Sequence, residues 1–473
     1  MRSLAASLIR GILFLPNRSL VHRSQLALLN NRWSSTCVSS RHISSFTNMG
    51  SQFDASELTP FKVLVLGGCY GGLSAALNLI DLSEGRAARQ GNGVVPGHDG
   101  KIPIDITIVN ERDGYYHLIG SPLALADDAY AAKAWVRYAD IPALKTPKIT
   151  TIQGKATGVN PASKRATVLE TATQAQRDLA YDYLVVATGL RRAWPVVPQS
   201  LYRKQYLTEA GSHISAVTDA PAGVVVVGGG AVGIEMAAEL KAVRPETRVT
   251  LVHSRDKLLS SEPLPDECKD RALELVRDAG VETVLGRRLA GTEEVAREGG
   301  KTVTEVTFTD GQKMDASVVI MAVSRSVPST EFLPAEALEE GGLIRARPDL
   351  RFAGEVPNAD VHFGIGDAIK WSGIKRCGGA MHMGYYAAHN IHELVLEKLK
   401  GTAPKLLELG EIPPMIGLAV GKKAMSYSPG QGVDSGEEVM RVFFGDDLGF
   451  DICWRHMRLG EQTGLPKGSP VGG

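Results

Sequence analysis

Residues 223–240 read GVVVVGGGAVGIEMAAEL, a run of valines followed by a glycine cluster and an alanine-rich stretch. This succession is typical of a buried strand that turns directly into a helix. Gly228, Gly230 and Gly233 fill all three glycine places of the fingerprint G-x-G-x-x-G. The first glycine permits the tight turn, the second lets a pyrophosphate approach the backbone, and the third lets helix and strand pack closely. The stretch therefore predicts a dinucleotide-binding turn, with the phosphates at the helix N-terminus.

A second copy of this plan lies about 160 residues earlier, where residues 63–77 read VLVLGGCYGGLSAAL. Its fingerprint places hold Gly67, Cys69 and Gly72, so a cysteine stands where the middle glycine is expected. Cys69 admits three interpretations: a redox residue, a broken cofactor site, or a tolerated small side chain. We favour the third, because no other cysteine lies at a redox-motif spacing.

Two such turns in one chain predict an α/β protein with two Rossmann-like domains, the second inserted in the first, followed by a C-terminal α+β segment. The expected first domain comprises residues 60–195 and 329–398. The expected inserted domain covers 196–328, and the C-terminal segment covers 399–473. Within that last segment, the stretch EVMRVFFG alternates apolar and polar residues, a pattern typical of a strand.

Composition places the chain among globular proteins, since 44% of its 473 residues are hydrophobic and 22% are charged. Residues 1–50 hold six arginines and no acid, which leaves 46 basic and 52 acidic residues elsewhere, a net charge of −6. No nucleic-acid partner is expected of a body with that charge. The arginine- and serine-rich start predicts a mitochondrial presequence, with a disordered tail as the alternative. Initiation at Met49 would instead give a cytoplasmic or lipid-surface protein.

The first turn is expected to bind FAD, because later pieces of the sequence complete such a site. Glu111 is the expected ribose ligand, with Asn110 at the more usual position of the acid. The carboxylate of Asp367 can accept hydrogen bonds from ribityl hydroxyls. The full set of expected FAD-binding residues is Gly67, Gly68, Cys69, Tyr70, Gly71, Gly72, Asn110, Glu111, Arg112, Thr188, Gly189, Gly366 and Asp367.

The second turn is expected to bind a nicotinamide dinucleotide through Gly228, Gly230 and Gly233. The strand after it ends in His253, Ser254 and Arg255 rather than in an acid. Donors and positive charge at that place suit a 2′-phosphate, which favours NADPH while leaving NADH open. Glu235 lies near enough to the helix start to reach the nicotinamide or its ribose. An ordinary solvated position for Glu235 and Glu239 is the alternative.

The order GGxxGG, ATG, GGGxxGxE and GxGD resembles the pyridine-nucleotide-dependent flavin oxidoreductases. The segments ERDGYYHLIGSPLA, MAVSRSVPSTEFL and WRHMRLG most resemble the apoptosis-inducing-factor-like branch with its ferroptosis-suppressor flavoproteins, and more distantly the type II NADH dehydrogenases. The resemblance covers about residues 60–460. It implies hydride transfer from NAD(P)H to flavin, and then electron transfer to a quinone or another acceptor.

By this resemblance, residues 374–390 should line the edge of the flavin ring, with Lys375 and His382 as candidates for contact with the flavin or the quinone. No acid–base pair is required for hydride transfer, and no metal site is expected, because the five cysteines lack metal-ligand spacing. Cys377 has no evident partner. The stretch IPPMIGLAVGKKAMSY mixes apolar residues with a lysine pair, so it either touches a membrane surface or covers the core.

Two other functions remain open at this point. A flavoprotein of the apoptosis-inducing type would act mainly in signalling or structure, with slow redox turnover. A reductase for a protein partner such as a ferredoxin would need a basic surface near the flavin. The sequence does not decide the oligomeric state.

Overall fold

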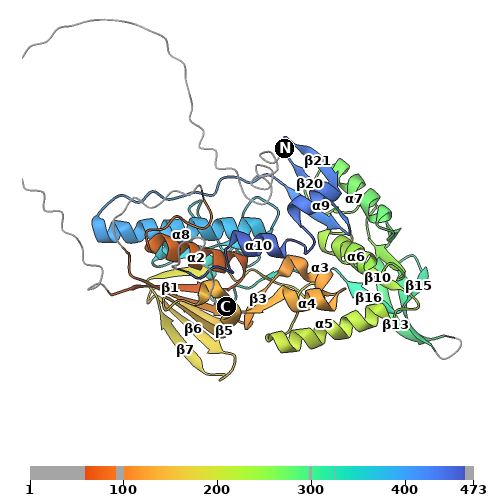
Figure 1. Cartoon of the computed structure of the whole chain (residues 1–473), viewed down its shortest axis with the longest axis horizontal. Helices are drawn as coiled ribbons and strands as arrows, with labels where there is room; N and C mark the ends of the chain where they lie inside the picture. The colour runs from red at the N-terminus through yellow and green to blue at the C-terminus, as the bar shows by residue number, and fades with distance from the viewer. Residues whose placement is uncertain (1–58, 92–100, 298–300, 324, 464–473) are drawn as a thin grey trace, which may run out of the picture.

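The computed structural model describes residues 59–91, 101–297, 301–323 and 325–463. The predicted presequence and the alternative start at Met49 lie outside these residues. Figure 1 shows two sheet-containing lobes, with the C-terminal elements lying against both of them.

The first lobe is built on a seven-stranded sheet of order β18-β8-β1-β2-β5-β6-β7. β1, β2, β5, β8 and β18 pair in parallel, and β6 and β7 extend the sheet as antiparallel strands. β1 and β8 read as nearly unbroken apolar runs because helices cover their sheet, as parallel strands require. The strand bounds are β1 Phe61–Leu66, β2 Ile104–Asn110, β5 Ile149–Asn160, β6 Arg165–Glu170, β7 Gln176–Ala180, β8 Tyr183–Val186 and β18 His362–Gly364.

Two helices from opposite ends of the chain lie side by side on this sheet (Figure 1). They are α2, Tyr70–Ser83, and α8, Cys377–Lys400, and every residue of α2 is buried. Glycines allow their close approach: a Cβ at Gly384 would lie 2.4 Å from the carbonyl oxygen of Gly71. The first lobe is therefore completed only by residues some 300 positions downstream.

The second lobe has a four-stranded parallel sheet of order β12-β11-β10-β16. A three-stranded antiparallel sheet, β13-β14-β15, extends from it. Both sheets fall between two strands of the first sheet, β8 and β18, so the predicted fold of two Rossmann-like units is confirmed. The bounds are α5 Arg203–Thr218, β10 Val224–Val227, α6 Ala231–Val243, β11 Val249–Val252, α7 Asp266–Asp278, β12 Glu282–Val284, β13 Leu289–Ala296, β14 Thr302–Phe308, β15 Lys313–Ala316 and β16 Val318–Met321.

The C-terminal segment adds a three-stranded antiparallel sheet and two helices. Leu418, Val420 and Met425 are buried against the second lobe, so of the two interpretations of this stretch, membrane contact or covering of the core, the structure favours the second. Among the described residues, no helix is long and apolar enough to cross a membrane. The bounds are β19 Ile416–Val420, β20 Lys423–Ser428, β21 Gly432–Gly436, α9 Glu437–Phe443 and α10 Phe450–His456.

The alternating stretch EVMRVFFG forms helix α9 and not a strand. Glu437 and Glu438 occupy its first turn, where negative charge favours a helix start. Val439 and Phe443 are its buried residues, and their spacing of four places them on one helical face. The helical period was present in the sequence beside the alternation. Short elements complete the fold: β3 Gly114–Tyr116, α3 Ser121–Ala124, α4 Asp128–Ala134, β4 Trp135–Arg137, β9 Leu190–Arg191 and β17 Val327–Pro328.

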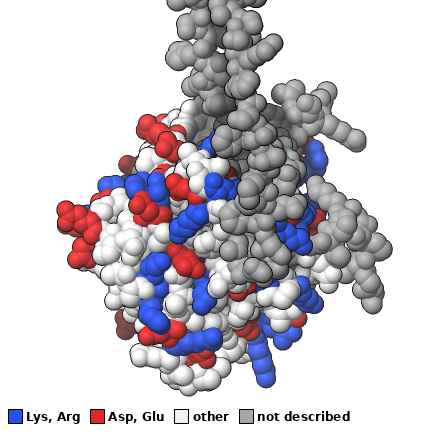
Figure 2. Space-filling model, turned by 90° about the vertical axis from the view of Figure 1, so that its left-hand side faces the viewer, with Lys and Arg blue, Asp and Glu red and all other residues white. Residues whose placement is uncertain are grey.

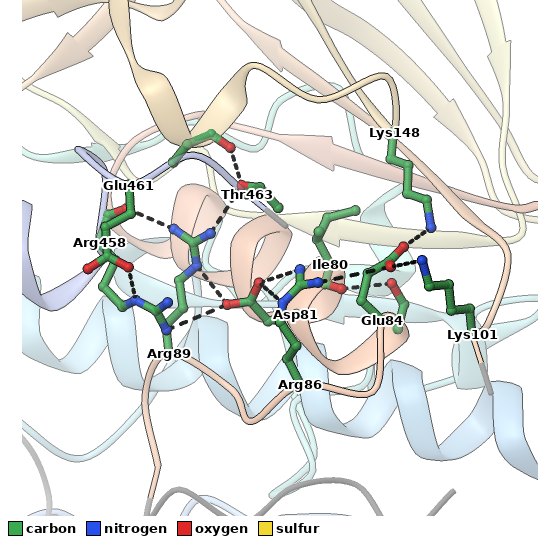
Figure 3. A network of polar contacts seen from close by, with 12 residues as sticks. Ile80, Asp81, Glu84, Arg86, Arg89, Lys101, Lys148, Arg458, Glu461 and Thr463 are labelled. Atoms are coloured by element: carbon green, nitrogen blue, oxygen red, sulfur yellow. Dashed lines mark hydrogen bonds and ion pairs between the residues drawn. The ribbon is translucent and has the colours of Figure 1, made fainter. Parts of the chain in front are cut away.

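A buried polar network, called the clamp below, fastens the C-terminal segment to the first lobe (Figure 3). Its centre is the ion pair of Asp81 and Arg89, whose side chains are only 3% and 2% exposed. Arg89 also donates hydrogen bonds to the carbonyl oxygens of Met457 and Arg458 and to Oγ1 of Thr463. The clamp therefore joins α2 directly to the residues after α10. Elsewhere on the surface, the face in Figure 2 shows basic and acidic side chains interspersed.

Candidate active site

The two glycine turns have the same geometry. Gly67 and Gly228 have φ angles of +100° and +127°, which favour glycine. A Cβ at Gly72 would lie 1.8 Å from the carbonyl oxygen of Gly67, and a Cβ at Gly233 would lie 1.8 Å from that of Gly228. Each turn thus needs its first glycine for conformation and its last for close packing of helix on strand.

The middle position of the fingerprint imposes no such requirement. Gly230 has φ −80°, and a Cβ built there meets no atom within 4 Å. Cys69 has φ −106°, which any residue adopts, so its backbone is unstrained. Its thiol donates to the carbonyl oxygen of Tyr116 at 3.4 Å, and burial raises its pKa to about 12. Cys69 is therefore a protonated, inward-packed side chain, as the tolerated-substitution interpretation requires.

Each turn offers free donors to a pyrophosphate. In the described part of the chain, the backbone N–H groups of Gly71 and Gly72 at the start of α2 donate no hydrogen bond, and neither do those of Val232 and Gly233 at the start of α6. Free N–H groups and a positive dipole end together make an anion site. Both turns therefore fit a dinucleotide, FAD at the first and NAD(P)H at the second.

Side chains at the ends of β2 and β11 hold the two turns in the same way. The N–H of Gly68 donates to Oδ1 of Asn110 at 3.0 Å, and the N–H of Gly229 donates to Nδ1 of His253 at 3.1 Å. The phenol of Tyr138 adds a hydrogen bond to the carbonyl oxygen of Gly68, at 2.6 Å. Asn110 and His253 are thus anchors of the turns, and no local pattern in the sequence marks the role of Tyr138.

The anchoring role corrects the prediction for His253 as a ligand of a 2′-phosphate. Its Nε2 shares a hydrogen bond with Oγ of Ser260 at 2.9 Å, so both ring nitrogens are engaged within the turn. Burial, assisted by the nearby Arg255 charge, lowers its pKa, and the ring stays neutral. Ser254 and Arg255 remain exposed at the rim, whereas the Lys257 ammonium is paired with Asp266 and Asp270.

The residues after β2 divide between rim and core. The carboxylate of Glu111 pairs with Arg191 at 2.7 Å and stays partly exposed, within the region of the expected ribose. Arg112 donates to the carbonyl oxygen of Pro198 at 2.9 Å and lies over the ring of Trp135, so its guanidinium has a structural role. The Tyr70 phenol is buried against His117, which leaves only its backbone to face a cofactor.

The loops after β8 and β18 meet at the first turn. A Cβ at Gly67 would lie 2.4 Å from the carbonyl oxygen of Ala187. The hydroxyl of Thr188 donates a hydrogen bond to the backbone carbonyl oxygen of Ser329, at 2.6 Å. Gly189 and Gly366 have φ angles of +66° and +69°. This arrangement brings the separate predicted FAD segments together.

The carboxylate of Asp367 is the polar group best suited to hold FAD here. Among the described residues it accepts no hydrogen bond, and burial raises its pKa against the opposing charges of Lys375 and Arg192. Lys375 donates to the carbonyl oxygens of Asp367 and Ile369, at 2.6 and 3.0 Å, so it fixes the loop that carries the carboxylate. A half-buried carboxylate that accepts no hydrogen bond among the described residues fits the ribityl hydroxyls of a flavin.

A cavity of about 470 Å³ opens between the two lobes next to this loop. Leu190, Pro328 and Leu343 give it apolar walls on the side of the first lobe, and Arg192 and Lys375 give it two cations. The carboxylate of Glu262 and the hydroxyls of Ser326 and Ser372 also line the cavity, and its size suits a small molecule. Arg192 was missed by the sequence analysis because nothing in the local pattern marks it.

Two other predicted residues lie elsewhere. His382 is not among the residues lining this cavity. Its ring lies 4.3 Å from that of Tyr386, its Nε2 is buried without a partner among the described residues, and burial lowers its pKa to about 4. Glu235 faces the C-terminal sheet, where the N–H of Ala419 donates to Oε1 at 3.3 Å. His382 thus lies outside the cavity, and its contact with the flavin stays a prediction.

Glu235 and Glu239 are not ordinary solvated acids. Burial raises the pKa of Glu235 to about 8, with the backbone N–H of Ala419 opposing it and the nearby Glu239 and Cys377 adding to it. Burial likewise raises the pKa of Glu239 to about 7. The Glu235 carboxyl therefore holds its proton to a higher pH than a solvated acid does, while its Oε1 accepts from Ala419.

Comparison with known proteins agrees with this site. Residues 61–384 match the family model described as pyridine nucleotide-disulphide oxidoreductase, so the chain belongs to that family. The family and the fitted turns make it an NAD(P)H-dependent, FAD-containing oxidoreductase.

Among particular relatives, the chain is 50% identical over 428 residues to oxidoreductase OXR1 of Ajellomyces capsulatus, which covers 89% of this chain and 92% of that protein. It is 25% identical over 417 residues to ferroptosis suppressor protein 1 of Mus musculus, covering 87% and 99%. NDH2 from Plasmodium falciparum, solved in complex with NADH, shares the fold with a TM-score of 0.61 at 13% identity, covering 85% of this chain and 98% of that one. The predicted resemblance is thereby confirmed.

Proposed function

We propose that this oxidoreductase takes electrons from NADPH and delivers them to a quinone. The observation that carries the proposal is the cavity between the lobes, which has apolar walls and two cations, Arg192 and Lys375, among its lining residues. A quinone ring is flat and apolar, and its two carbonyl oxygens accept hydrogen bonds from cations. Bound FAD would supply the hydride acceptance and the two-electron transfer that no side chain provides.

The residues of the chain have distinct tasks in this proposal. The glycine turns and Asp367 hold and orient FAD, and Arg255 favours a cofactor with a 2′-phosphate. Arg192 and Lys375 line the cavity, where their positive charges would favour the carbonyl oxygens of the acceptor.

Steady-state turnover of FAD-loaded protein tests the proposal, with NADPH and NADH each assayed against a short-chain quinone, ferricyanide and a ferredoxin. We expect the highest kcat/KM with NADPH and quinone. Arg192→Gln should raise the KM for quinone about five-fold, as the loss of roughly 1 kcal/mol predicts. The control is Arg177→Gln, on the hairpin of the first sheet. It should leave the KM for quinone unchanged, because among the described residues the exposed Arg177 guanidinium pairs only with Glu170.

Flavin bleaching by NADPH under anaerobic conditions separates the alternatives. Bleaching without reoxidation by any quinone would favour the signalling flavoprotein, and rapid reoxidation by ferredoxin alone would favour the protein-partner reductase. Absence of bleaching with both nicotinamides would contradict all three functions.

A further inference from the structure

Two buried tyrosines share the imidazole of His117 beside the first glycine turn. Nδ1 of His117 lies 3.0 Å from the phenol oxygen of Tyr115 and 3.2 Å from that of Tyr70. Tyr70 is the first residue of α2, directly after the turn, and Tyr115 lies in β3. Tyr115 and His117 are completely buried. None of the three side chains has a task in the proposed quinone reduction.

The imidazole of His117 is placed to accept a proton. Its Nε2 lies 3.0 Å from the carbonyl oxygen of Leu448, which can only accept a hydrogen bond, so Nε2 carries the ring proton. Nδ1 therefore offers its lone pair to the phenols, and Tyr115 makes the shorter contact. Burial lowers the pKa of His117 to about 4, with the hydrogen bond to Leu448 opposing this effect and the charge of Lys133 adding to it. The ring is thus neutral.

The phenol of Tyr115 does not ionise by itself. Burial raises its pKa well above 10, so the phenol keeps its proton at neutral pH. Loss of an electron makes a phenol strongly acidic, and its proton then needs an acceptor within hydrogen-bond reach. Nδ1 of His117 meets this geometric condition. Oxidation of Tyr115 therefore gives a neutral phenoxyl radical beside an imidazolium.

An aromatic side chain connects this buried site to the surface. The ring of Trp454, in α10, lies 6.4 Å from that of Tyr115, centroid to centroid, and is stacked on Phe450 at 5.5 Å. Aromatic rings with centroids within about 7 Å are in contact. Electrons pass readily between rings that touch. Because Trp454 is partly exposed, a dissolved oxidant can take an electron from its indole.

We propose that Tyr115, His117 and Trp454 form a one-electron redox site that reduces small radical oxidants, such as oxygen-centred radicals. A radical X• takes an electron from the Trp454 indole and becomes X⁻. The phenoxyl radical is less oxidising than the indole radical cation, so Tyr115 gives an electron to the indole. The phenolic proton moves to Nδ1 of His117 in the same step. This activity needs no quinone and goes beyond the proposed function.

Restoration of the phenol takes one electron and one proton. The electron comes from the flavin that NAD(P)H reduces, and the proton returns from Nδ1 of His117. Two such events consume two radicals and one NAD(P)H, and they give two X⁻, NAD(P)⁺ and one proton. The oxidative half of this cycle can be measured without any nicotinamide.

Pulse radiolysis of the FAD-loaded protein tests the oxidative half. Azide radicals oxidise tryptophan side chains, and the absorbance of the indole radical should decay as that of a tyrosyl radical grows. This phase should be first order and independent of protein concentration. Trp454→Phe, which keeps an aromatic ring against Phe450, should abolish it. Trp194→Phe is the matched control, because Trp194 is also partly exposed but its ring lies against that of His213.

The proton transfer has a readout of its own. His117→Gln should slow the phase by about 100-fold, the usual contribution of a positioned base, because a glutamine oxygen accepts a hydrogen bond but takes no proton. Bound-flavin absorbance and near-ultraviolet circular dichroism check that this variant is folded. In the unaltered protein, D2O should slow the phase about two-fold or more, since a proton moves with the electron.

An unchanged phase in Trp454→Phe, or equal rates in H2O and D2O, would overturn the proposal. Addition of NAD(P)H before the pulse should shorten the lifetime of the tyrosyl radical, and an unshortened lifetime would contradict the reducing cycle. The radical phase is measured without nicotinamide or quinone. Its absence is therefore distinguishable from a failure of the proposed quinone reduction, which steady-state turnover measures.

Discussion

The backbone N–H of Gly229 donates a hydrogen bond to Nδ1 of His253, 3.1 Å away, as the N–H of Gly68 does to Oδ1 of Asn110 in the first lobe. Both acceptors follow or end the second strand of their unit, at the position where an acid would otherwise contact the ribose. The two turns are thus held in the same way. Asn110 and His253 stand where a nucleotide ligand is expected, but each accepts a hydrogen bond from the glycine loop and fixes its shape.

Asn110→Ala should weaken FAD binding. It removes a partly buried acceptor from the N–H of Gly68, a loss of about 1 kcal/mol that corresponds to a five- to ten-fold rise in the Kd of FAD. Fluorescence titration of the apoprotein with FAD measures this change. Asn160→Ala is the control, because the exposed Asn160 amide accepts only from Ser163 in the hairpin. An unchanged Kd in Asn110→Ala would contradict the anchoring role.

His253 should make NAD(P)H binding sensitive to acid. Its Nδ1 accepts from Gly229 only when the ring is neutral, and the fold lowers its pKa below 6.5. The stabilising contact is therefore present above pH 6.5 and is lost as the pH falls through the lowered pKa. The KM for NAD(P)H should rise between pH 7 and pH 5. His253→Asn, which copies the first lobe, should keep the acceptor and lose this step; persistence of the step would assign it to another group.

Arg255 should set the preference for NADPH. Its guanidinium is exposed at the end of β11, where a 2′-phosphate would lie. Arg255→Gln should lower kcat/KM for NADPH by about ten-fold or more, which corresponds to the loss of one charge-assisted hydrogen bond. The kcat/KM for NADH should change little. Lys257→Gln is the matched control, since two carboxylates already neutralise Lys257. Equal losses with both cofactors would count against a 2′-phosphate contact.

Glu239→Gln should stabilise the protein at alkaline pH. The fold raises the pKa of Glu239 to about 7, so ionisation above that pH costs folding free energy that the unfolded chain does not lose. The destabilisation grows as the pH rises from about 4.5 to 7 and is constant beyond. Thermal unfolding at pH 8.5 should show a higher Tm for Glu239→Gln, by an amount equivalent to ~1–3 kcal/mol, and little difference at pH 5. A lower Tm at both values would show that the carboxylate is needed.

Asp81→Asn should release the C-terminal segment. The variant leaves the Arg89 guanidinium buried without its counter-charge, and breaking a buried ion pair from one side costs about 3–5 kcal/mol. Limited proteolysis should then cut near residues 457–463 faster than in the unaltered protein. Asp140→Asn, which loses an exposed pair with Arg137, should be cut at the original rate. Equal rates for both variants would mean that other contacts hold the segment.

The elements that carry the dinucleotides could be predicted from local sequence. Valine runs and glycine spacings specify a strand, a turn and a helix within about twenty residues, and β10 and α6 formed as the pattern at 223–240 indicated. The positions of Thr188 and Asp367 at one edge of the first sheet could also be predicted, because each follows a strand and parallel strands bring their ends to one edge.

Side-chain contacts between distant segments could not be predicted in this way. Glu235 and Glu239 were placed near solvent or cofactor, but β19 comes from about 180 residues later and covers them. The clamp of Arg89 depends on where the residues after α10 dock, which no local pattern encodes. His253 was predicted to be a cationic ligand because the sequence shows its residue type but not its burial or its hydrogen-bond partners.

The pairing of α2 with α8 has a consequence for biosynthesis. On the ribosome, the second lobe emerges as one contiguous stretch and can close its sheet as soon as β16 is available. The first lobe must wait, since α2 has no helix to cover it until α8 has been translated, and the clamp closes later still. The nascent chain therefore carries an exposed apolar helix throughout most of its synthesis. The order of its elements thus makes chaperone protection necessary during translation.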